Sequence, residues 1–127
     1  MSYKDTKAES GKDYSYTVRA IAKGYRSAYQ KYDIYYLAAP KITKFDSQVG
    51  KGITVKWGAV KGTTGYYVYR KTANSGWVRI AAVGGTNNTT YLDKTAQKGV
   101  TYTYTVRAVY GATTSYFNPG ISCMDKY

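Results

Sequence analysis

The feature that most constrains this chain is an internal repeat. Residues 3–20, YKDTKAESGKDYSYTVRA, align with residues 91–108, YLDKTAQKGVTYTYTVRA, at a constant offset of 88 residues and with 10 identities in 18 positions. A fixed period of this kind indicates repeated structural units, and about 100 residues is the usual size of a small β-sandwich. The repeat therefore predicts one complete module over residues 39–127 and, in residues 1–38, only the final strands of a similar module.

Alternation along the chain predicts that both copies consist of β-strands. The composition includes 17 Tyr, which together with Val and Thr suits a pleated sheet, and no segment has the apolar spacing of an amphipathic helix. In ITVKW (53–57) and YTYTVRA (102–108), every second residue is apolar or aromatic, which sends one set of side chains toward a core. We expect an all-β chain: a seven-stranded β-sandwich preceded by a β-hairpin. The seven strands are expected at residues 41–47, 52–58, 65–71, 76–83, 89–93, 101–110 and 113–124.

The residue types that most enzymes depend on are scarce. The chain has no His, one Cys (Cys123) and 7 Asp plus Glu, which excludes an intrachain disulfide, a zinc site of thiolates and a Ser–His or Cys–His nucleophile pair. The repeat-related Asp5 and Asp93 indicate turn capping, and no spacing suggests the paired carboxylates of a glycosidase. We expect a non-enzyme with no catalytic, cofactor-binding or metal-binding residues, in which Cys123 is a buried, inert thiol.

The net charge is +12, so the chain is attracted to polyanions such as anionic glycans and cell-wall polymers. The basic residues are scattered and no nucleic-acid-binding motif is present, so we expect no specific nucleic-acid partner. No apolar segment approaches the roughly 20 residues that a membrane helix needs, so we expect no membrane insertion.

Several motifs together resemble the fibronectin type III modules of Gram-positive bacterial surface proteins and extracellular enzymes. They are ITVKW, WGAVKGTTGYYVYRK, a YLD step and Gly-x-x-Tyr-x-Tyr-x-Val-x-Ala, and they cover residues 39–127 and, partially, 3–38. The resemblance implies an Ig-like sandwich in which Trp57 is the core tryptophan. It also implies that Tyr102 is a tyrosine corner, with its hydroxyl bonded back to the chain near Gly99, and that Tyr14 holds the matching position. The structural core residues are accordingly expected to be Trp57, Tyr102, Tyr104, Val106 and Tyr14.

Two functions remain open at this point. The resemblance implies a non-catalytic spacer or interaction module of a larger bacterial extracellular or cell-surface protein, whose partners are the other domains of that polypeptide. The alternative is a module that binds carbohydrate or an anionic cell-wall polymer through exposed tyrosines and basic residues, with Tyr67, Tyr69 and Arg107 as the candidate ligand face. The surplus tyrosines either form such a face or pack against neighbouring modules.

Residues 3–38 carry a separate expectation. A hairpin with one apolar face is at best marginally stable alone in water, so we expect it to have a partner. That partner is either a second copy, by strand addition or by exchange of residues 3–38 for residues 91–124, or the complete module of the same chain, on which the hairpin would fold back as an extra sheet layer. Met1 leads directly into strand-like sequence, which suggests a fragment boundary, and the sequence does not decide between such a boundary and a natural incomplete module.

Overall fold

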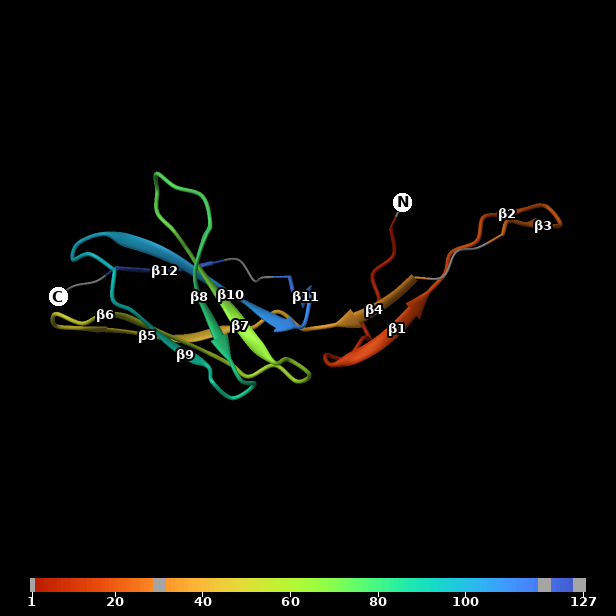
Figure 1. Cartoon of the computed structure of the whole chain (residues 1–127). Helices are drawn as coiled ribbons and strands as arrows, with labels where there is room; N and C mark the ends of the chain where they lie inside the picture. Colours follow the sequence, from red (N-terminus) through yellow and green to blue (C-terminus); the bar gives the residue numbers. More distant parts are fainter. Residues whose placement is uncertain (1, 29–31, 117–119, 125–127) are drawn as a thin grey trace.

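The computed structural model describes residues 2–28, 32–116 and 120–124, and every regular element in these ranges is a β-strand. The all-β prediction is therefore confirmed. Figure 1 shows two parts, a two-layered sandwich made by the later strands and a narrow ribbon, drawn in red and orange, that projects from one end of it. The described part of the chain contains no helix long and apolar enough to cross a membrane.

Two antiparallel sheets form the sandwich. The smaller sheet consists of β5 (Ile42–Gln48), β6 (Gly52–Trp57) and β9 (Thr90–Asp93), in the order β5-β6-β9. The larger sheet consists of β7 (Gly65–Lys71), β8 (Val78–Gly84), β10 (Thr101–Tyr110), β11 (Thr113–Thr114) and β12 (Ile121–Met124). Its order is β11-β10-β7-β8, and β12 also pairs with β10. The chain therefore changes sheets after β6, after β8 and after β9, as in a Greek-key sandwich.

The core lies between the two sheets, where alternation along β6, β7 and β10 points one set of side chains inward. Trp57 of β6 packs edge-on against Tyr66 of β7, with 5.4 Å between the ring centroids, so this aromatic pair joins the two sheets. The other apolar or aromatic residues of these strands that are at most 4% exposed are Ile53, Val55, Val68, Tyr102, Tyr104, Val106 and Ala108.

The final strand differs from the prediction. The sequence suggested one strand over residues 113–124, whereas the structure has β11 and β12, which pair with opposite ends of β10. Val109 lies opposite Thr114, and Tyr104 lies opposite Ile121, so the register shifts by two residues between the two pairings. A single regular strand cannot satisfy both registers, and alternation alone does not reveal such a shift.

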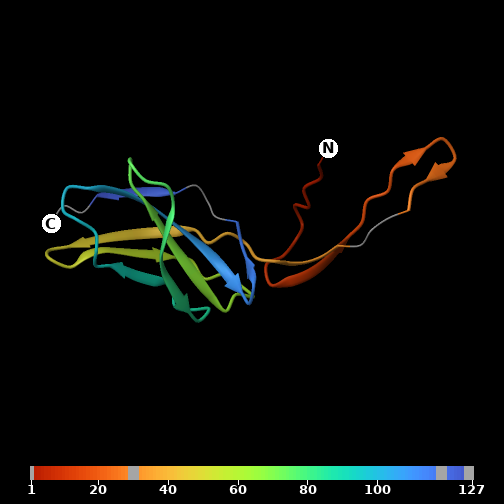
Figure 2. The same cartoon turned by 45° about the horizontal axis from the view of Figure 1, so that its top comes forward.

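The N-terminal ribbon is the segment that precedes the sandwich. In it, β1 (Lys12–Tyr16) pairs with β4 (Tyr32–Tyr36), and β2 (Ile21–Ala22) and β3 (Tyr25–Arg26) form a short hairpin between them. Figure 2 shows this hairpin at the end of the ribbon farthest from the sandwich. The expected hairpin is present, but β1 ends at Tyr16, so Val18 and Ala20 lie outside its strands and are exposed, whereas their repeat equivalents Val106 and Ala108 are buried.

Candidate functional site

The outer face of the larger sheet brings the candidate ligand residues together. Tyr67 and Tyr69 alternate along β7 with the buried Tyr66 and Val68, so their rings lie on the face turned away from the core. Arg107 of β10 is opposite Tyr67 in the register of the two strands. Tyr67, Tyr69 and Arg107 therefore form one continuous surface.

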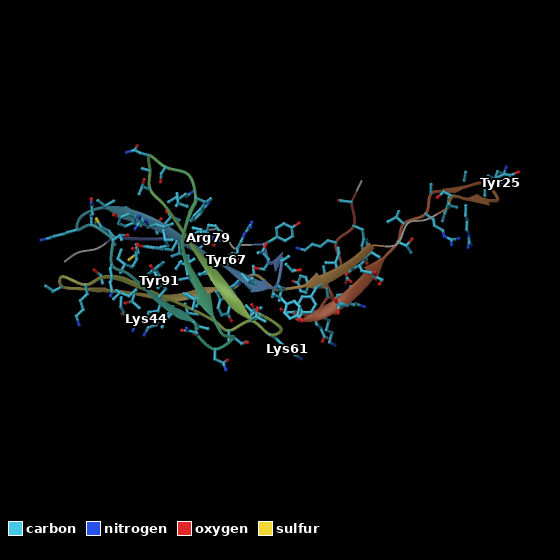
Figure 3. All side chains as sticks on the ribbon, viewed as in Figure 1. Tyr25, Lys44, Lys61, Tyr67, Arg79 and Tyr91 are labelled. Atoms are coloured by element: carbon cyan, nitrogen blue, oxygen red, sulfur yellow. The ribbon has the colours of Figure 1, made fainter. Side chains whose placement is uncertain are left out.

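Each aromatic ring on this face is covered by a cation. Figure 3 shows Arg79 of β8 beside Tyr67 of β7, and two similar pairs lie farther along the sheet. Such contacts contribute about 0.5–1 kcal/mol each at exposed sites, so they hold the rings and the cations in a fixed arrangement. The distances from cation to ring centroid are 4.6 Å for Arg79 over Tyr67, 5.7 Å for Arg107 over Tyr69 and 4.8 Å for Lys71 over Trp77.

The cations over these rings limit which ligands this face can bind. Tyr67 and Tyr69 are only half-exposed, while Arg79 is exposed beyond them. A sugar ring would have to displace a guanidinium before it could stack on either tyrosine. The face is therefore suited to holding anionic groups through its cations, and less suited to stacking on neutral sugars. We name Tyr67, Tyr69, Lys71, Trp77, Arg79 and Arg107 the cation face.

A second cluster lies inside the sandwich around Asp93, which is 1% exposed at the end of β9. Arg70 of the opposite sheet donates from Nη1 to Asp93 Oδ2 at 2.7 Å, and the Tyr104 hydroxyl donates to the same oxygen at 2.7 Å. Thr95 donates to Oδ1 from its backbone N at 3.1 Å and from Oγ1 at 2.7 Å. The carboxylate therefore caps its own turn, as expected, and also ties the two sheets together.

These contacts shift two pKa values in opposite directions. Burial by itself would raise the pKa of Asp93, but hydrogen bonds from Thr95, Tyr104 and Arg70 outweigh it and place that pKa below its ordinary value. Burial, with the neighbouring Asp93 carboxylate, raises the pKa of Tyr104 far above its ordinary value. Asp93 is thus a structural anion and Tyr104 a structural hydrogen-bond donor over the whole neutral range.

The N-terminal ribbon repeats this hydrogen-bond pattern. The Tyr16 hydroxyl donates to Asp5 Oδ2 at 3.0 Å, and the backbone N of Lys7 donates to Asp5 Oδ1 at 2.9 Å. With the offset of 88 residues, these bonds match those that Asp93 accepts from Tyr104 and from the backbone of Thr95. The aspartate that the repeat singled out therefore has the same local role in both copies.

The tyrosine corner is present in both copies as well. The backbone N of Gln97 donates to the Tyr102 hydroxyl at 2.9 Å, two residues before Gly99, and the backbone N of Glu9 donates to the Tyr14 hydroxyl at 2.7 Å. Tyr102 is buried, whereas Tyr14 is only half-buried. Of the expected core residues, Trp57, Tyr102, Tyr104 and Val106 lie in the core, and Tyr14 lies in the ribbon outside it.

A close junction connects the N-terminal ribbon to the sandwich. The backbones of Gly11 and Gly62 touch, with φ values of 81° and 84°, and a Cβ atom on Gly11 would lie 2.8 Å from the Gly62 Cα. The Tyr35 hydroxyl donates to the Gly62 carbonyl at 2.8 Å, and the Tyr35 ring stacks on Tyr110 with centroids 4.4 Å apart. Leu37, which follows the ribbon, is buried in the core of the sandwich.

Ser10 fixes the same junction through two hydrogen bonds. Its hydroxyl donates to the Lys61 carbonyl at 2.7 Å and accepts from the backbone N of Ala38 at 2.9 Å. Beside it lies a cavity of about 490 Å³ whose charged lining residues are Lys41 and Lys61. Because the serine hydroxyl is engaged on both sides, it positions the chain at this junction.

The described residues offer no assembled metal centre, since no three His, Cys, Asp or Glu side chains among them come together. Cys123 is half-buried against the core cluster, so its predicted complete burial is only partial.

Sequence reasoning missed Arg70 and the two junction glycines. The repeated Asp5 and Asp93 revealed the turn, but Arg70 belongs to a strand with no second copy in the chain, so no repeat pointed to it. The contact between Gly11 and Gly62 joins loops far apart in the sequence, and only the surplus tyrosines indicated that such packing exists.

Comparisons with known proteins agree with this topology. No protein-family model matches the chain, and no curated protein sequence matches it. The structure is similar to that of a two-domain fibronectin type III segment from chicken tenascin, with a TM-score of 0.60 and 21% sequence identity. The chain therefore has a fibronectin type III-like fold.

The extent of the match is informative about the N-terminal ribbon. The chain spans 65% of the length of the tenascin segment, while the match covers 90% of this chain. Residues 39–127 alone are too few to account for that coverage, so the match includes part of residues 1–38.

Proposed function

We propose that this chain is a non-catalytic spacer that holds consecutive fibronectin type III-like modules of a longer extracellular polypeptide in a fixed orientation. The observation that carries the proposal is the junction, where Gly11 and Gly62 touch and Tyr35 both stacks on Tyr110 and donates to the Gly62 carbonyl. A flexible connection would not need two backbones in contact. The bacterial cell-surface setting is supported by the motif resemblance.

Gly62→Ala tests the fixed orientation. A Cβ atom at this position would overlap the Gly11 Cα, so the two backbones must separate and the ribbon must change its angle or become mobile. Spin labels at Asp13→Cys and Asn74→Cys, in a Cys123→Ser background, report the distance between ribbon and sandwich. We expect a narrow distance distribution in the parent and a shifted or clearly broader one in Gly62→Ala.

Gly99→Ala is the matched control. Gly99 also has a positive φ, 78°, but a Cβ atom there meets nothing within 4 Å. It therefore carries the cost of an alanine in a left-handed conformation, about 1–2 kcal/mol, without the clash at the junction. An equal broadening in both variants, or an unchanged distribution in Gly62→Ala, would contradict a spacer role based on this junction.

A second function, binding of an anionic glycan or cell-wall polymer, is favoured by the cation face. Three cations lie in a row over three rings there, and the net charge of the chain is +12. Heparin, as a sulfated glycan probe, should bind in a salt-dependent and saturable way. We expect Arg79→Gln combined with Arg107→Gln to weaken this binding by about tenfold or more. Each lost contact between an arginine and a sulfate group also removes the release of a counterion from the glycan.

Lys44→Gln combined with Lys56→Gln is the control for net charge. Both lysines lie near Asp46 on the smaller sheet, away from the cation face, and their loss changes the net charge equally. If the two double variants weaken heparin binding to the same degree, the attraction comes from overall charge and the cation face is not a binding site.

A further inference from the structure

The N-terminal ribbon reproduces the second half of the sandwich in more detail than its sequence shows. The backbone N of Ala20 donates to Ser27 Oγ at 2.9 Å and the backbone N of Ser27 donates to the Ala20 carbonyl at 3.0 Å. Ala108 and Ser115 make the same two bonds, both at 2.9 Å. The β2–β3 hairpin also has the register of the β10–β11 hairpin, displaced by 88 residues. Residues 3–27 thus follow the path of residues 91–115.

The apolar face of the ribbon lacks the cover that its counterpart has. Val18 is 83% exposed and Ile21 77% exposed, whereas the equivalent Val106 and Val109 are 0% and 8% exposed in the sandwich. Ile34, opposite Tyr14 in the register and therefore on the same face, is 51% exposed. In the sandwich, the smaller sheet covers this face, and β7 pairs with β10 within the larger sheet.

The gap between β1 and β2 indicates which strand of the sandwich has no counterpart beside the ribbon. The equivalents of residues 17–20 are residues 105–108, and in the sandwich these pair with β7 but not with β11 or β12. In the ribbon, β1 ends at Tyr16 and β2 begins at Ile21. The strand is therefore interrupted over the stretch where a β7-like strand would supply the ladder.

Asp5 identifies the chemistry of the missing partner. Asp93, its equivalent, receives a hydrogen bond from Arg70 of β7, and the Arg70 guanidinium also lies over the Tyr102 ring at 4.7 Å. Asp5 and Tyr14 reproduce the carboxylate and the ring, but the described residues of the ribbon, 2–28 and 32–36, include no strand equivalent to β7. A partner for this face should therefore place an arginine between Asp5 and Tyr14.

A second copy of the chain does not satisfy this requirement. Each chain holds one front half, residues 39–90, and two segments that fit against it, residues 3–36 and 91–124. If these segments are exchanged between copies, each front half still covers one segment. One segment per chain therefore stays exposed in the assembly. Exchange therefore gains no buried apolar area, and the driving force for it is absent.

We propose that the exposed face of residues 3–36 binds the front half of a fibronectin type III-like module, a segment resembling residues 41–90 that is joined in line at residue 2 and carries an arginine for Asp5. By the offset of 88 residues, Thr90 corresponds to residue 2. The end of such a segment therefore lies next to Tyr3, where the ribbon begins, so the segment and the ribbon can be joined in one chain. The inference does not depend on the spacer role.

The test is a fusion that places residues 39–88 of this chain ahead of Met1 of the full chain. The amide of Thr17 should exchange with solvent at least about 100-fold more slowly in the fusion than in the parent, because its counterpart Thr105 pairs with Tyr69 of β7 inside a cooperative unit. The urea m-value should rise, because a second module adds surface that is exposed on unfolding. Replacing Arg70 with Met in the added segment only should reduce the protection, while a fusion with the added residues in scrambled order should give none.

Three results would overturn the proposal. The added segment could leave the Thr17 amide unprotected while the amides of residues 53–57 of the full chain stay protected. The Arg70→Met and unmodified fusions could protect the Thr17 amide equally. The parent chain alone could be a dimer by light scattering with the Thr17 amide already protected, which would make a second copy the occupant. The spin-label distances distinguish this proposal from the spacer role. If the ribbon is protected in the fusion but the distance between ribbon and sandwich is broadly distributed, only the spacer role is contradicted.

Discussion

The buried ion pair between Arg70 and Asp93 allows a quantitative prediction. Arg70→Met removes one of the donors to Asp93, a carboxylate that is 1% exposed, and leaves its charge without a cation. Loss of one partner from a buried pair typically destabilises a protein by about 3–5 kcal/mol. Protonation of Asp93 sets an upper limit on the cost of its unpaired charge. At pH 7, a carboxyl group with an ordinary pKa of 3.8 can be neutralised for about 4 kcal/mol, at 1.36 kcal/mol per pH unit. We therefore expect a loss of about 3–4 kcal/mol at pH 7.

The same reasoning predicts how the loss changes with pH. The pKa of Asp93 is lowered in the folded chain, so the stability that its charged form contributes is present above pH 3.8 and is lost as the pH falls through the lower folded value. In Arg70→Met the carboxyl can be neutralised for only about 1 kcal/mol at pH 4.5, so the difference from the parent should shrink to about that size. Urea unfolding followed by the fluorescence of the buried Trp57 measures both values.

Arg79→Met is the control for this experiment. Arg79 is exposed and contacts the Tyr67 ring, so its loss should cost no more than about 1 kcal/mol and should not depend on pH in this range. If Arg70→Met lies within about 0.5 kcal/mol of the parent at pH 7, or if its effect is the same at pH 4.5, the assignment of Asp93 as a charged structural residue is wrong.

Two further predictions concern the core and the tyrosine corner. Trp57→Ala should lower the free energy of unfolding by about 3–5 kcal/mol, because it empties a large buried site between the sheets, and a smaller loss in denaturant melts would mean that the site collapses or is not core. Tyr102→Phe should cost about 1–3 kcal/mol because the backbone N of Gln97 loses its acceptor, whereas the matched Tyr14→Phe should leave the unfolding of the sandwich unchanged. Equal effects of the two tyrosine variants would contradict the separation of ribbon and sandwich.

Much of the fold could be predicted from local pattern. Alternation in ITVKW and YTYTVRA identified the inward faces of β6 and β10, and the repeat identified Tyr14 and Tyr102 as equivalent corners. These features depend on the two-residue alternation of side chains along a strand and on hydrogen bonds between residues five positions apart. Both are local along the chain, so they can be predicted from one sequence. Alternation left the faces of GYYVYRK undecided, and only the burial of Tyr66 and Val68 in the structure places Tyr67 and Tyr69 on the outer face.

The sequence could not locate features that depend on distant strands. The two-residue register shift between β11 and β12 leaves alternation unchanged, and the cations over Tyr67 and Tyr69 come from neighbouring strands whose pairing the sequence does not specify. Sequence reasoning therefore treated those rings as open to a ligand, whereas the structure covers them.

What the sequence by itself determined is the all-β class, the repeat and the local hydrogen-bond motifs, because each follows from neighbouring residues. What only the tertiary structure decided is which of two nearly identical segments is covered. Asp93 and Asp5 have the same local bonds, but only Asp93 meets Arg70, since the strand that carries this arginine occurs once in the chain. The physical reason is that burial, pKa shifts and ion pairs arise from the packing of sheets against each other, and packing is a property of the assembled sandwich.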